Sequence, residues 1–152
     1  MIPSITDLAP QIVALMQAEN IPLRDPVSAT AFAEFEQNWN VEIPPEMRTF
    51  YEIMDGTSRD FGITRDLFCI WPLSEVKPIP ALLPEPVYAE YRDVADAPRI
   101  LCFSDYLINS DVFAVRTVGD CEIISVCNGH KTVAASMGDF MHRLLVDPIS
   151  LM

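Results

Sequence analysis

The strongest constraint on the fold is a series of four strand-like segments in the second half of the chain. Residues 99–136 contain RILCFSDYL, DVFAVRTV, CEIISVC and KTVAAS, which are rich in β-branched and aromatic residues. The intervening INS, GD and NGH are short, and Asn128-Gly129 is a strong hairpin signal because both residue types tolerate positive φ. Connections this short join antiparallel neighbours, so the sequence predicts an antiparallel meander.

Amphipathic helices flank this region. Ser4 and Ser136 each precede an aspartate by three residues, which resembles a capping box at a helix start. Pro44 and Pro45 suit the first positions of a helix, and Gly56 suits its C-terminal stop. The expected helices span residues 4–18, 28–40, 44–56 and 136–147.

The period changes from helical to alternating near residue 66. DLFCIWPL is expected to form a short strand, and the proline-rich residues 73–98 a structured connection. We therefore predict a single α+β domain over residues 1–152, in which N-terminal helices and one C-terminal helix pack on the sheet. The expected core residues are Phe35, Trp39, Phe50, Tyr51, Leu101, Phe103, Phe113, Val115, Ile124, Phe140 and Leu144.

Charge limits the classes of partner. The chain has 22 acidic and 10 basic residues, a formal net charge of −12. Such a surface repels phosphate backbones, so we expect no nucleic-acid ligand. It attracts cationic proteins, although acidity that only maintains solubility is an open alternative. No apolar run is long enough to cross a membrane, and the start of the chain lacks a secretory signal, so we expect a cytoplasmic protein.

The sequence predicts no metal, cofactor or catalytic centre. Its four cysteines, at positions 69, 102, 121 and 127, lie among apolar residues and are expected to be buried free thiols. Cys121, Cys127 and His130 lack a fourth ligand for a zinc site. His130 falls in a hairpin turn, where we expect it to be exposed. A small-molecule enzyme that uses Cys127 and His130 is the rival hypothesis.

Acidic and polar residues gather in two places, around the helix at residues 44–56 and in the turn near residue 108. Ordinary solvated helix residues and turn-forming side chains are the alternatives to a binding role. We predict that together they border one acidic protein-binding face, formed by Glu46, Glu52, Asp55, Asp60, Asp66, Asp105, Asn109 and Asp111.

Three stretches resemble the Smi/Knr family of the SUKH superfamily. FAEFEQNWNVEIPPEMRTFYEIMDGT is similar to that family's opening, through Ile43-Pro44, Phe50-Tyr51 and Asp55-Gly56. ILCFSDYLINSDVFAVR resembles its strand-turn-strand, and VAASMGDFMHRLLVDP resembles its closing strand and helix. Asp55-Gly56-Thr57 differs from the usual Asn-Gly-Gly type of turn, and Gly138 stands where an aromatic residue is common.

The resemblance implies a twisted antiparallel sheet packed by helices, and a binding function. Bacterial members are mostly regarded as immunity proteins that neutralise polymorphic toxins, often nucleases or deaminases, whereas fungal members act as regulatory scaffolds. The implied partner is a cognate toxin with a basic surface. A scaffold that binds several host proteins is the alternative within the same family.

Overall fold

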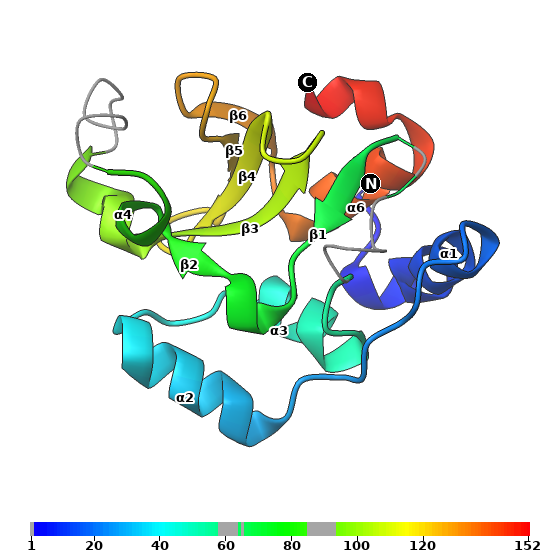
Figure 1. Ribbon diagram of the computed structural model, residues 1–152, viewed down its shortest axis with the longest axis horizontal. Coiled ribbons are helices and arrows are strands. Elements are labelled where there is room, and N and C mark those ends of the chain that lie inside the picture. Colours follow the sequence, from blue (N-terminus) through cyan, green and yellow to red (C-terminus); the bar gives the residue numbers. More distant parts are fainter. Residues whose placement is uncertain (1, 58–63, 65, 85–93) are drawn as a thin grey trace.

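The computed structural model describes residues 2–57, 64, 66–84 and 94–152 (Figure 1). Helices come first along the chain, then most of the strands, then a final helix. The elements are α1 (Ile5–Ala18), α2 (Ala29–Trp39), α3 (Pro45–Ile53), β1 (Phe68–Ile70), η1 (Leu73–Glu75), β2 (Lys77–Pro78), α4 (Ile79–Leu82), η2 (Val94–Arg99), β3 (Ile100–Tyr106), β4 (Asp111–Arg116), β5 (Ile123–Ser125), β6 (Lys131–Ala134), α6 (Met137–Val146) and η3 (Pro148–Leu151), where η denotes a 3-10 helix.

The strands form one antiparallel sheet in the order β1-β3-β4-β5-β6, and β2 also pairs with β3. The predicted meander is confirmed as β3 to β6. The predicted strand in DLFCIWPL is β1, whose Phe68 lies opposite Tyr106. Strand β2 was not predicted, because a two-residue strand beside prolines has no recognisable period.

Buried aromatic rings join the sheet to the last helix. Phe140 of α6 lies 5.2 Å from the ring of Phe103 and 5.4 Å from that of Phe113, centroid to centroid. Helices α1, α3 and α6 also contact one another, as Figure 1 shows to the right of and below the sheet. The mixed α+β fold is confirmed, with its core between the sheet and these helices.

Serine caps begin three of the helices, as predicted for Ser4 and Ser136. The Oγ atoms of Ser4, Ser28 and Ser136 accept hydrogen bonds from backbone amides three residues later, at 3.0 to 3.1 Å. Each bond satisfies an amide that has no partner within its helix. These helix starts are therefore determined by residues only a few positions apart.

Gly56 is not the helix stop that was predicted, since α3 ends at Ile53 and Met54 is already extended. Gly56 has a φ of 62° and packs against the chain that leaves β1. A Cβ atom there would lie 2.5 Å from the carbonyl oxygen of Trp71. Glycine is therefore required by a positive φ and by close backbone packing.

Some burial predictions were wrong. Trp39, at the last position of α2, is only partly buried, whereas the other ten predicted core residues are buried. Cys127 is exposed and Cys121 half-buried, whereas Cys69 and Cys102 are buried as predicted. His130 is fully buried although it precedes β6 in a turn, where positive φ falls on Gly129 and His130.

Candidate protein-binding surface

Four of the predicted site residues meet at one end of the sheet. Asp66 precedes β1, while Asp105, Asn109 and Asp111 lie at the turn from β3 to β4. Strand register brings these segments together, because Tyr106 lies opposite both Phe68 and Asp111. We call this region the sheet end.

Asp105 is an internal residue of the sheet end and not a surface group. Its side chain is buried, and its Oδ2 accepts a hydrogen bond of 2.5 Å from the indole Nε1 of Trp71. The hydroxyl of Tyr51 on α3 donates in turn to the carbonyl oxygen of Trp71 at 2.6 Å. The Asp105 carboxylate thus belongs to a buried polar chain that joins the sheet to α3.

The other three residues of the sheet end are nearer to solvent. Asp111 is half-buried and accepts from Ser125 Oγ on β5, at 2.7 Å to Oδ1 and 2.8 Å to Oδ2. Asp66 and Asn109 are exposed. These two can meet a partner without breaking a bond within the fold.

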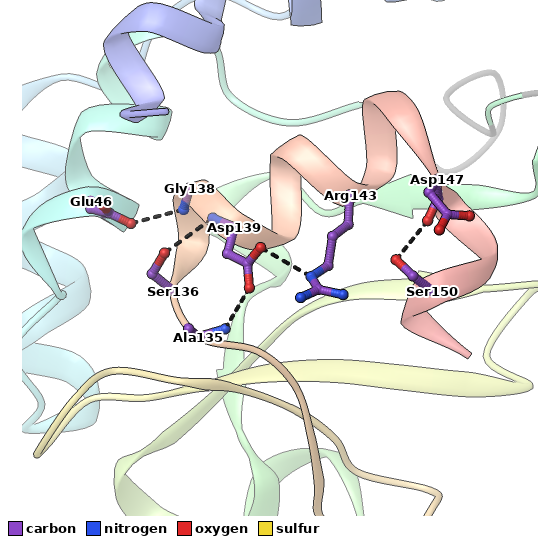
Figure 2. Close-up of polar contacts among 8 residues, drawn as sticks. All are labelled: Glu46, Ala135, Ser136, Gly138, Asp139, Arg143, Asp147 and Ser150. Atoms are coloured by element: carbon purple, nitrogen blue, oxygen red, sulfur yellow. Dashed lines mark hydrogen bonds and ion pairs between the residues drawn. The ribbon is translucent and has the colours of Figure 1, made fainter. Parts of the chain in front are cut away.

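Glu46 lies at the other end of β4. It lines a small cavity together with Val115, which is four residues along the strand from Asp111, or roughly 13 Å. Its Oε2 accepts a hydrogen bond of 2.8 Å from the backbone amide of Gly138, at the start of α6 (Figure 2). Glu46 therefore adds a long-range cap to α6, whose positive dipole end favours a carboxylate.

Asp139 completes this cap. Its Oδ2 accepts from the amide of Ala135 at 2.9 Å, and its Oδ1 from Arg143 Nε at 3.0 Å (Figure 2). A Cβ at position 138 would lie 2.9 Å from the carbonyl oxygen of Pro3. Glycine at position 138 therefore fits the close approach of the backbone at Pro3.

The remaining predicted residues are spread around α3. Asp55 accepts from the amide of Leu73 at 2.7 Å and lies 3.7 Å from the Nε of Arg24. Glu52 is exposed, and Asp60 lies outside the described residues. The structure therefore brings four of the eight residues together, separates Glu46 from them, and uses several of the carboxylates as structural acceptors.

A groove of about 570 Å³ runs between α2 and the segment around η1, and sequence reasoning did not predict it. Glu34, Phe35 and Trp39 line one side, and Asp55 and Leu73 line the other. The half-buried Trp39 at the end of an amphipathic helix was the available signal, but its apolar character led to the core prediction.

Arg48 of α3 fixes α2 beside this groove. Its Nη2 lies 3.0 Å from Glu36 Oε1, and its guanidinium carbon is 4.5 Å from the centre of the Phe32 ring. Glu36 Oε2 also accepts from the amide of Ile43 at 2.9 Å. The position of α2 therefore depends on a part-buried ion pair and a cation–π contact.

Neither a metal site nor a membrane span is evident in the described part of the chain. It contains no group of three or more His, Cys, Asp or Glu side chains arranged to hold a metal ion. No helix within the same residues is both long and apolar enough to pass through a bilayer.

Comparison with known families supports the resemblance noted above. The sequence model of the SMI1 / KNR4 family (SUKH-1) matches residues 26–143, which is most of the chain. The match extends from the segment before α2 into α6, so it includes both the groove and the sheet end. No curated protein matches the chain.

Proposed function

Because the chain belongs to the SMI1/KNR4 family (SUKH-1), we propose that it is a non-catalytic protein-binding domain that acts as an immunity protein. It binds a cognate toxin directly and thereby neutralises it. The toxin has a basic surface, and a nuclease or deaminase fits this description because an enzyme that handles nucleic acid needs a basic cleft.

The observation that carries this proposal is an excess of acidic side chains beyond those that the fold uses. Glu46, Asp55 and Asp105 accept hydrogen bonds within the fold. Asp66 at the sheet end and Glu52 on α3 are exposed, and the chain has a formal net charge of −12. A surface of this kind speeds the encounter with a cationic protein, in a manner that depends on salt.

The rival hypothesis of an enzyme that uses Cys127 and His130 is less well supported. Desolvation by neighbouring groups raises the pKa of the Cys127 thiol, against the lowering effect of a backbone hydrogen bond with Val112, and the nearby Asp111 charge also raises it. A raised pKa lowers the thiolate fraction at neutral pH, whereas a nucleophilic cysteine needs a lowered pKa. The raised pKa of Cys127 therefore supports the binding proposal over a nucleophilic role for this thiol.

The proposal is tested first by genetics and growth. The gene beside this one is expected to encode the toxin, and co-expression of the chain is expected to restore growth of cells that make that toxin. An isolated gene, together with pull-downs that recover host proteins only, would contradict the proposal and favour a regulatory scaffold.

Association kinetics test the contribution of the sheet end. Replacement of Asp66 by Asn is expected to slow association with the toxin and to flatten its salt dependence. Asp120→Asn is the control, because exposed Asp120 follows β4 at the opposite end of that strand. Equal effects at the two ends would show that only net charge matters.

A further inference from the structure

Exposed apolar side chains concentrate at the sheet end. Nine large apolar residues are exposed among those that the structure describes, and five of them are Leu67, Leu107, Ile108, Ile149 and Met152. Ile108 and Ile149 are 75% and 80% exposed. They belong to three chain segments, namely the residue before β1, the turn from β3 to β4, and η3 with the residue that follows it. We call these five residues the sheet-end patch.

Direct contacts hold these segments together. The amide of Leu107 donates to the carbonyl oxygen of Leu67 at 2.9 Å. Leu67, Ile149 and Met152 line one hollow of about 260 Å³, with Tyr106 and the Asp66 side chain. Leu67 therefore connects the turn that carries Leu107 and Ile108 to the hollow that Ile149 and Met152 line. Exposed apolar patches of this kind often mark protein-binding sites.

The backbone of the patch adopts conformations that its side chains disfavour. Leu107, Ile108 and Asn109 have consecutive φ values of 48°, 51° and 65°, and Leu67 has a φ of 71°. Asn accepts this region readily, but for a β-branched residue such as Ile108 it is a genuine outlier. Because Ile108 is exposed and its φ is positive, its side chain adds neither buried apolar area nor a favourable turn conformation to the stability of the fold. Strained residues of this kind concentrate at functional sites.

Charge decides which kind of partner fits. Asp66 lines the hollow, and exposed Asp147 immediately precedes η3. Two copies of a chain with a formal net charge of −12 repel each other, so a second copy is disfavoured. An apolar patch with basic residues around it complements both the exposed side chains and the acidic edge.

We propose that the sheet-end patch is the docking surface for a cationic protein, in which Ile108 and Ile149 are the apolar anchors. The inference rests on the proposed function, because the partner is the neutralised toxin. Exposed Asp66 and Asp147 lie at the edge and act mainly on the encounter rate. The two isoleucines are buried on binding and determine mainly the dissociation rate.

The test is the double variant Ile108→Asn and Ile149→Ser, with association and dissociation rates measured against the toxin across a salt series. Asn is chosen because it tolerates the left-handed backbone at position 108, so the variant is expected to fold. We expect Kd to rise at least about tenfold through faster dissociation, with the salt dependence of association unchanged. The matched control replaces exposed Leu23 and Val118 by Ser, and we expect wild-type affinity.

The possible outcomes separate the two proposals. If the double variant binds the toxin as tightly as the wild-type chain does, the proposal that the sheet-end patch is the docking surface is overturned, but the proposed immunity function is not. Loss of binding in Trp39→Ala instead would assign the interface to the α2 groove. A wild-type chain that sediments as a dimer, and that the double variant makes monomeric, would show that a second copy covers the patch. Failure of the wild-type chain to bind the toxin would overturn both proposals.

Discussion

Replacement of Asp105 by Ala separates a structural role from a binding role at the sheet end. The substitution removes the carboxylate that accepts from the indole of Trp71, and both side chains are buried. A hydrogen bond to a charged group contributes about 1.5 to 3 kcal/mol. The second contact, from the amide of Asn109 at 3.4 Å, is long and adds little. We therefore expect a loss of about 2 to 3 kcal/mol in the free energy of unfolding.

Urea denaturation measures this loss. With a slope of roughly 2 kcal/mol per molar urea, the unfolding midpoint of Asp105→Ala should fall by about 1 to 1.5 M. Asp105→Asn retains an acceptor oxygen and should lose only about 1 kcal/mol, since a neutral bond replaces a charged one. Asp66→Asn should leave the midpoint unchanged but slow toxin association. A midpoint for Asp105→Ala equal to wild type, with association slowed, would refute the structural assignment.

Three further predictions address the backbone and the buried ionisable groups. Gly56→Ala places a Cβ 2.5 Å from a carbonyl oxygen at a φ of 62°, so thermal unfolding should show a loss of about 2 to 5 kcal/mol in stability. Gly129→Ala, which also has a positive φ but open space around it, should lose only about 1 to 2 kcal/mol. Equal losses in the two variants would contradict the steric argument. Ile108→Asn should raise the free energy of unfolding by about 1 kcal/mol, measured in urea, because it relieves strain at an exposed position; a less stable variant would contradict this. Burial raises the pKa of the Tyr51 phenol and the Cys102 thiol above their usual values of 10.0 and 9.0, so in the folded chain they keep protons that the unfolded chain releases. Stability should therefore be complete below about pH 9 and fall as pH rises further, less steeply in Tyr51→Phe, as urea midpoints between about pH 7 and 11 will show.

Local patterns were sufficient for much of the fold. The serine caps of α1 and α6 were predicted, because each depends on a side chain and an amide three residues apart. The meander of β3 to β6 was predicted as well, because short turns allow only antiparallel neighbours. In both cases the interacting groups are close in sequence, and periodicity reports them.

Distant partners could not be predicted. The Asp105 carboxylate was assigned to a surface because its bond to Trp71 spans 34 positions. The burial of His130 could not be predicted either, because a residue in a turn is usually exposed and the sequence gives no sign of the segments that cover it. The exposure of Ile108 could have been predicted, because it is an apolar residue within the predicted turn INS. The polar residues beside it were interpreted as turn-forming, and the exposure of Ile108 itself was not considered.

The bond between Glu46 and Gly138 has a consequence for how the chain is made. The two residues are 92 positions apart, and ribosomes add roughly 5 to 20 residues per second. Glu46 is therefore synthesised roughly 5 to 18 seconds before Gly138, at the start of the helix that it caps. Closing a loop of this length also costs conformational entropy, and this cost arises before the contacts between α3 and α6 stabilise the fold. Docking of α6 onto α3 is thus expected to be a late step in folding, after α3 and the strands before α6 have been synthesised.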